Sequence, residues 1–180
     1  APEPVWAVSL GGEMADVTLS LAIGPEGAIY AGGHTNSKTF QVAGEIHAQM
    51  PPDDIRQVFI TRILPDGEPD WTRPLGGEGD DRLRAVAPRA AGGVLAAGFT
   101  GSKNLVIGEH QFNSAGKFEA WAAGLAVDGK VDWAISFGGE KDEILLATAE
   151  DSEGSVYLGG YFSSASVQIG DLNLVNTLDK

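Results

Sequence analysis

The stretch "WTRPLGGE" at residues 71–78 is the most informative part of this sequence, because the chain contains the same phrase two more times. It returns as "WAVSLGGE" at 6–13 and as "WAISFGGE" at 133–140, so that successive tryptophans lie 65 and 62 residues apart. Self-similarity at a nearly fixed period indicates a repeat architecture, in which each copy is one structural unit. The repeat markers are Trp6, Trp71, Trp133, Gly11, Gly12, Gly76, Gly77, Gly138 and Gly139.

The copies stay in register beyond this phrase. An acid recurs at one offset (Asp16, Asp81, Glu143), and a later apolar run ends on a shared glycine (Gly33, Gly98, Gly160). "FQVAGE", "LVIGE" and "VQIGD" then correspond after a slip of one residue, and an Asp-Gly pair precedes Trp71 and Trp133. We therefore predict a single repeat domain over 1–180, with repeats at 6–70, 71–132 and 133–180, the third truncated.

Each repeat is predicted to consist of β-strands. "TLSLAI" alternates between polar and apolar residues, "QVFITRIL" is rich in β-branched and aromatic residues, and glycine-containing turns separate such segments. We expect about four strands a repeat: at the tryptophan, after the acidic loop, before the shared glycine, and before the Asp-Gly turn. Four antiparallel strands per repeat are typical of a β-propeller blade. The sequence thus predicts an all-β fold, a partial β-propeller of about three four-stranded blade-like repeats.

The pattern "W…(L/F)GGE…D", then "G-x-(V/I)-Y-x-x-G", then "(V/A)-(F/W)…DG…W" resembles the bacterial SBBP-type β-propeller repeat, over essentially the whole chain. The resemblance implies a module of an exported bacterial protein, located in the periplasm or at the cell surface. We expect a non-catalytic binding or scaffold module, an accessory subunit or a fragment of a larger assembly. The alternatives are an enzyme or quinoprotein-like fragment with its active site in missing blades, and a Ca²⁺-dependent or glycan-binding adhesion module.

Three repeats do not make a complete propeller, which closes with four to eight blades. An open series leaves two unpaired sheet edges and two end faces without a neighbour. Three explanations remain open: the chain is a fragment, several chains complete one ring, or a different subunit caps the series. Each of them predicts protein partners or further blades.

The charge, the composition and the first residues of the chain indicate which partners and which location to expect. The net charge is −13, from 25 acidic and 12 basic residues, which argues against nucleic acid as a partner. The chain has no cysteine and no apolar run long enough for a transmembrane segment. Its start, "APEPVW", is typical of a mature end left after removal of a signal peptide, which is a second reason to expect export.

The repeated tryptophans allow two interpretations, an aromatic ligand platform or a wedge packed between neighbouring sheets. Recurrence at one offset in every copy favours packing, because a ligand site needs a single such residue whereas packing needs one in each unit.

The acidic loops also allow two interpretations. Their carboxylates either accept hydrogen bonds from the turns or hold Ca²⁺, which takes six to eight oxygen ligands. The weak metal candidates are Glu13, Asp16, Glu78, Asp80, Asp81, Glu140, Asp142 and Glu143. The histidines, His34, His47 and His110, form no zinc-like pattern, and we predict no cofactor and no catalytic residue.

The segment 47–57, "HAQMPPDDIRQ", is the one stretch that does not repeat. Two consecutive prolines interrupt any strand there and predict a protruding loop. Because residues that differ between repeats are better suited to specific contacts, we expect a partner to bind Met50, Pro51, Pro52, Asp53 and Asp54.

Overall fold

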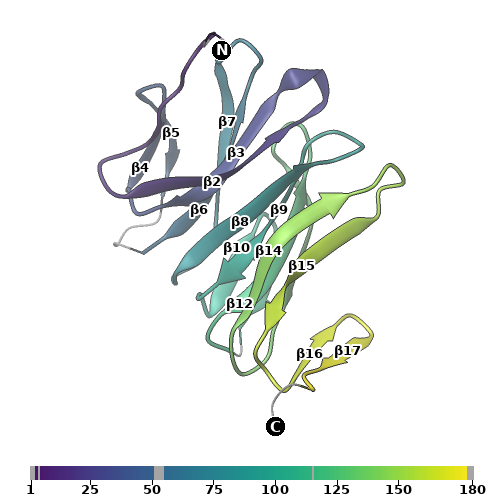
Figure 1. Cartoon of the computed structure of the whole chain (residues 1–180). Coiled ribbons are helices and arrows are strands. Elements are labelled where there is room, and N and C mark those ends of the chain that lie inside the picture. Colours follow the sequence, from purple (N-terminus) through teal and green to yellow (C-terminus); the bar gives the residue numbers. More distant parts are fainter. Residues whose placement is uncertain (1–2, 4, 51–54, 115, 178–180) are drawn as a thin grey trace.

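The computed structural model describes residues 3, 5–50, 55–114 and 116–177, and it is all-β, as predicted (Figure 1). All strand pairs are antiparallel, and the part described contains one short 3-10 turn, η1 (Pro25–Gly27), and no α-helix. None of the helical structure in these residues is long and apolar enough to cross a membrane.

Three sheets follow one another along the chain. The first has the strand order β2-β3-β6-β7, the second has the order β8-β9-β12-β13, and the third pairs β14 with β15. The first comprises β2 (Asp16–Ile23), β3 (Ile29–Thr35), β6 (Gln57–Ile63) and β7 (Pro69–Leu75). The second comprises β8 (Asp81–Pro88), β9 (Val94–Thr100), β12 (Glu119–Leu125) and β13 (Val131–Phe137). The third comprises β14 (Glu143–Glu150) and β15 (Val156–Phe162).

The four strands of one sheet come from two successive sequence repeats. Trp71 opens the second repeat, yet its strand β7 pairs with β6 of the first; Trp133 on β13 likewise pairs with β12. The reason is the Asp-Gly turn before each tryptophan, where Gly67 and Gly129 adopt positive φ and close a tight hairpin. Each sheet therefore begins after the acidic loop rather than at the tryptophan.

The extra segment of each repeat forms a hairpin outside the main sheets. These hairpins are β4 (Thr39–Val42) with β5 (Glu45–Gln49), β10 (Asn104–Ile107) with β11 (His110–Asn113), and β16 (Ser166–Ile169) with β17 (Leu172–Val175). The first pairs with β1 (Leu10–Gly11), and the second contacts Gly76 through Val106. Each of these two hairpins thus contacts the double-glycine segment that follows the tryptophan of the same sequence repeat.

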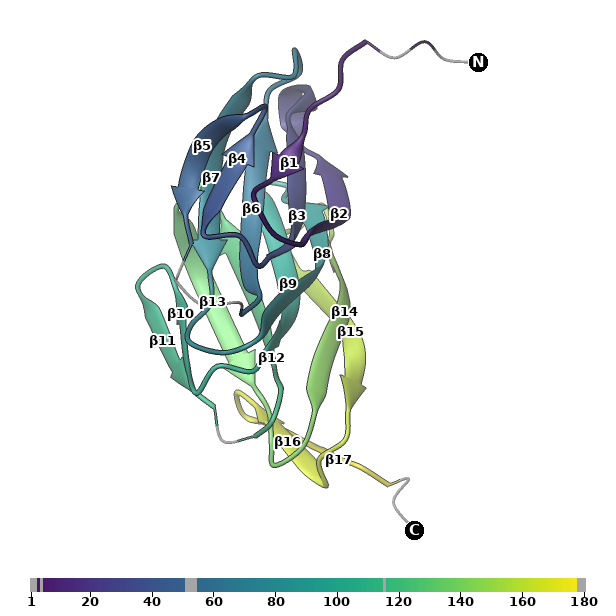
Figure 2. The same cartoon turned by 90° about the vertical axis from the view of Figure 1, so that its left-hand side faces the viewer.

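The sheets are stacked face to face, with β8 lying between β2 and β14 (Figures 1 and 2). Gly32 on β3 leaves the space that Leu83 and Val86 of β8 occupy, because a Cβ there would lie 2.9 Å from each side chain. These two residues belong to the main hydrophobic core, which also includes Trp71 and Trp121. A smaller cluster, around Ala97 and Leu145, joins the second sheet to the third.

The glycine shared by all repeats lies opposite a bulge in the neighbouring strand. A Cβ on Gly33, Gly98 or Gly160 would lie 1.9–2.1 Å from a backbone carbonyl oxygen of β2, β8 or β14. The register of the same strand pairs shifts beside each of these glycines. Because a bulge pushes one strand toward the other, only glycine fits at this position.

Candidate functional site

The repeated acid at Asp16, Asp81 and Glu143 ties the double-glycine turn to the end of the next strand. We call this arrangement the carboxylate clasp. In the second repeat Asp81 is fully buried and accepts hydrogen bonds from the amide of Gly77 (2.6 Å) and the hydroxyl of Ser102 (2.8 Å). The hydroxyl of Thr100 also donates to it. Burial raises the pKa of Asp81 above its ordinary value, against the opposing effect of these donors.

The other two clasps hold the second glycine of the turn in the same way. Gly12 donates its amide to Asp16 (2.7 Å), and Gly139 donates its amide to Glu143 (2.7 Å). In the third repeat Phe162 replaces the threonine, and the longer glutamate reaches the amide of Ser164 (3.0 Å) instead. The sequence predicted turn hydrogen bonds for these acids, but it did not identify the serines. Their signal is a serine at one offset in all copies: Ser37, Ser102 and Ser164.

The remaining metal candidates bind other groups in their own loops. Glu13 accepts hydrogen bonds from the amide of Lys38 (3.0 Å) and the hydroxyl of Thr39 (3.1 Å). Backbone hydrogen bonds, from its own amide and that of Lys38, lower the pKa of Glu13. Glu78 accepts from Asn104 (3.2 Å), and Asp80 pairs with Arg82 (2.6 Å).

Glu140 is exposed, and Asp142 has a buried carboxylate oxygen without a hydrogen-bond partner among the described atoms. Within the described ranges, no three histidine or acidic residues are grouped so that they could hold a metal ion. The candidate acids are thus divided among three loops, where most of them bind protein donors.

The repeated tryptophans pack against the hairpin turn of the next sheet. Trp71 donates its indole N–H to the carbonyl of Val127 (2.8 Å), and its ring lies where a Cβ on Gly129 would be 2.9 Å away. Trp6 makes the same pair of contacts: its indole N–H donates to the carbonyl of Pro65 (3.1 Å), and its ring lies where a Cβ on Gly67 would be 2.9 Å away. These contacts support the packing interpretation for two of the three tryptophans.

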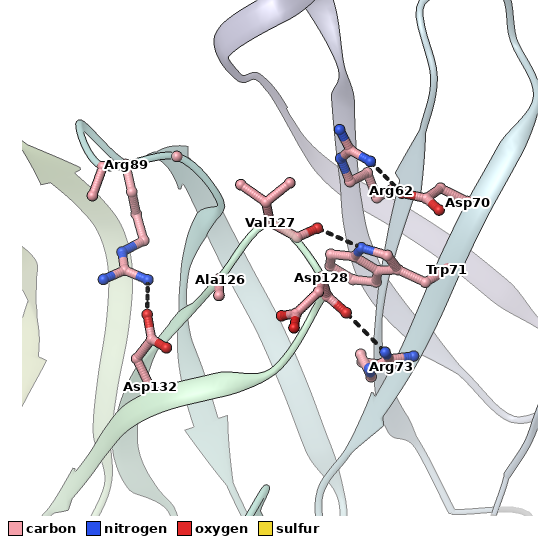
Figure 3. Close-up of a pocket in the computed structure, with 11 residues that line it drawn as sticks. Arg62, Asp70, Trp71, Arg73, Arg89, Ala126, Val127, Asp128 and Asp132 are labelled. Atoms are coloured by element: carbon pink, nitrogen blue, oxygen red, sulfur yellow. Dashed lines mark hydrogen bonds and ion pairs between the residues drawn. The ribbon is translucent and has the colours of Figure 1, made fainter.

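A cavity of about 710 Å³ lies beside Trp71, between strands β6 and β7 of the first sheet and the turn at 126–128 (Figure 3). Ion pairs flank it, Arg62 with Asp70 on one side and Arg89 with Asp132 (2.5 Å) on the other. Arg73 donates to the carbonyl of Asp128 (2.9 Å). The cavity is lined by arginine, aspartate, tryptophan and small apolar residues. This lining contains no nucleophile with an adjacent base.

The non-repeated loop is only partly described. Met50 is buried, with 7% exposure, in a cluster with Phe40, Val42 and Phe59. Pro51, Pro52, Asp53 and Asp54 lie outside the described residues.

His34 is a buried histidine in a positively charged environment. It lies on β3, at the offset that Phe99 occupies on β9. Burial, and secondarily the charges of Arg82, Arg56 and Arg84, lower its pKa to about 4, whereas Asp80 acts in the opposite direction. The imidazole is therefore neutral in the folded protein at pH 7.

We expect the protein to lose stability as the pH falls from 6.5 toward 4, because the unfolded chain takes up a proton at His34 before the folded chain does. Between pH 7 and 5 the loss is on the order of 1 kcal/mol, discounted for partial solvation, or ~2–4 °C in melting temperature. His34→Phe should remove this part of the pH dependence. Melting curves at pH 7, 6 and 5 test it, with His110→Asn as the control. An unchanged slope in His34→Phe would contradict the assignment.

Neither a scan against protein-family models nor a search of curated proteins returned a significant match to this chain.

Proposed function

We propose that the chain is a partial β-propeller that acts as a non-catalytic scaffold module, in which further sheets or a protein partner complete the stack. The observation that carries this proposal is the exposed apolar face of β2. Leu21 and Ile23 are 66% and 72% exposed, whereas Val86, at the offset of Leu21 in the second sheet, is buried against Gly32. Leu21 therefore stands where a preceding sheet would pack.

The opposite end of the stack has the same character. Tyr157 and Tyr161 on β15 are 60% and 51% exposed, and Leu146 on β14 is exposed as well.

The repeated polar groups bind the protein's own turns: the clasps hold the double glycines, and Trp71 contacts the next hairpin. This use of the repeated residues favours a structural role over catalysis. The resemblance to the SBBP-type repeat extends the proposal to a module of an exported bacterial protein.

The proposal predicts concentration-dependent association through the β2 face. We expect the average mass of the chain in solution to rise above that of one chain as concentration increases, because the exposed leucine and isoleucine gain by burial. Leu21→Arg combined with Ile23→Arg should return the chain to the mass of a monomer. Sedimentation equilibrium or light scattering measures this.

The matched control is Ile46→Arg, an exposed apolar residue on the β4–β5 hairpin whose equivalent in the next repeat is the exposed Gln111. This change should leave association unaltered. A wild-type chain that stays monomeric at every concentration and binds no hydrophobic dye would overturn the scaffold proposal.

A further inference from the structure

The third sheet has an unpaired edge at β15. The equivalent strands of the other sheets are paired on both sides: β3 lies between β2 and β6, and β9 lies between β8 and β12. Among the described residues, β15 pairs with β14 alone. An edge of this kind presents alternating backbone N–H and C=O groups that can accept another strand.

An apolar groove of about 240 Å³ lies beside this edge. It is bounded by the second sheet, the third sheet and the β16–β17 hairpin, and its lining includes Phe137, Leu158, Gly160, Val167 and Ile169. The groove is therefore placed to receive a side chain from a strand that pairs with β15.

The first two repeats show which side chain fits. Trp121 on β12 lies opposite Gly98 and belongs to the core cluster of Leu75, Leu105 and Ile107. Those three residues stand at the same offsets as Phe137, Val167 and Ile169.

The first repeat repeats the arrangement with a different aromatic residue. Phe59 on β6 lies opposite Gly33 and packs on Phe40, with ring centroids 4.2 Å apart. In both repeats a large aromatic side chain thus fills the position that corresponds to the groove in the third.

Trp133 gives an independent indication. Trp6 and Trp71 each donate the indole N–H to the carbonyl that precedes an Asp-Gly turn in the next sheet. The indole nitrogen of Trp133 instead lies against Gly124 of its own sheet, where a Cβ would be 2.4 Å away, and it donates to no such carbonyl among the described residues. An acceptor turn for Trp133 would belong to the same hairpin as a strand paired with β15.

We propose that the β15 edge, the groove and Trp133 form a docking site for a β-hairpin from a further repeat of the same pattern. The hairpin pairs antiparallel with β15, places Phe or Trp opposite Gly160, and offers the carbonyl before its Asp-Gly turn to Trp133. The hairpins β6–β7 and β12–β13 of the first two sheets each have these three features. The inference deepens the proposed scaffold function, on which it rests, by naming what completes the third sheet.

The probe is a synthetic peptide spanning Lys117–Phe137, the chain's own hairpin, added to the intact protein. We expect saturable binding in fluorescence anisotropy, a raised melting temperature, and slower amide hydrogen exchange in β15. A peptide carrying Trp121→Ala should bind at least ~30-fold more weakly, because it lacks the side chain that fills the groove. Since only the peptide changes, this comparison does not depend on the folding of a variant protein.

Two variants of the protein locate the site. Val167→Arg places a charge in the groove and should abolish binding, and Trp133→Phe removes the indole donor and should weaken binding ~5-fold. Ile46→Arg, on the exposed face of the β4–β5 hairpin, is the matched control and should bind like the wild type. Equal binding of the wild-type and Trp121→Ala peptides, or exchange protection that does not include β15, would overturn the proposal.

The outcome is separable from that of the scaffold proposal. A chain that associates through Leu21 and Ile23 but takes up no hairpin overturns this inference and leaves the scaffold proposal standing. Self-association through the β15 edge that the peptide fails to compete would also overturn it, in favour of a second copy as the occupant.

Discussion

Trp71→Ala is expected to lower the free energy of unfolding by ~3–5 kcal/mol, the range for removal of a large buried aromatic side chain. The ring is 7% exposed, lies 6.0 Å from the ring of Tyr30, and has the Arg73 guanidinium 5.3 Å from its centroid. It also joins two sheets, because it packs on the turn at Gly129 while belonging to β7. The substitution therefore leaves a cavity at the boundary between sheets, where neither sheet can close it alone.

Two further variants separate the contributions. Trp71→Phe keeps an aromatic ring and removes the hydrogen bond to Val127, so that the loss should be about 1–2 kcal/mol. Trp6 makes the equivalent contacts with Pro65 and Gly67, but in a more exposed place. Trp6→Ala should therefore have the smaller effect of the two alanine variants. Urea unfolding at one fixed protein concentration measures all three, because association would otherwise shift the midpoint. Unchanged stability in Trp71→Ala would contradict the packing role.

The strands and the tryptophan contacts could be predicted from the sequence because their causes are local or repeated. The alternation in "TLSLAI" and the β-branched residues of "QVFITRIL" correspond to β2 and β6. The segment Glu143–Glu150 could be taken for a helix by itself, but it is strand β14, like the segments at the same offsets in the other repeats. A tryptophan that recurs in every unit was expected to pack between units, and Trp71 does so.

The boundaries of the sheets could not be predicted from the repeat alone. A sequence repeat can be taken to begin at any of its positions, and the choice of the tryptophan as its first residue was arbitrary. The Asp-Gly turns at 66–67 and 128–129 join each tryptophan strand to the preceding strand, and pairing through a tight turn decides which sheet the strand enters. Those turns were visible in the sequence, but their consequence for the sheets depends on pairing.

The role of Met50 and the serine partners of the clasps depends on contacts between distant parts of the chain. Met50 precedes two prolines and was expected at the surface, but the β4–β5 hairpin buries it against Phe59. Ser102 lies 21 residues from Asp81, on the far side of two strands, and the hydrogen bond between them follows from the pairing of β8 with β9. The Met50 contact has no sequence signal, and the serines are marked only by their recurrence at one offset in the three repeats.

The second large effect is expected at the clasp of the second repeat, where Asp81→Ala should destabilise the protein by ~3–5 kcal/mol. Asp81 is 0% exposed and accepts hydrogen bonds from the amide of Gly77 and the hydroxyls of Thr100 and Ser102. Alanine leaves these donors buried without an acceptor, at about 1–3 kcal/mol for each group that finds no other partner. Urea unfolding again provides the measurement.

The comparison with the first repeat shows what burial contributes. Asp16→Ala removes the same set of hydrogen bonds, but Asp16 is only partly buried and the amide of Gly12 is near solvent, so water can replace the carboxylate. We expect a loss of ~1–2 kcal/mol there. Asp81→Asn should lie between the two alanine variants, because its amide oxygen still accepts from Gly77 while its NH₂ group faces two hydroxyls.

The clasp also predicts which residues lose protection from amide exchange in the Asp81→Ala protein. Without the carboxylate, the turn at Gly76 and Gly77 is released from Ser102, so amide exchange should rise first in residues 76–81 and 100–102. Equal destabilisation by Asp81→Ala and Asp16→Ala would show that burial of the clasp contributes nothing. A stabilised Asp81→Ala protein would instead show that desolvation of the carboxylate, which raises its pKa, outweighs the hydrogen bonds that it accepts.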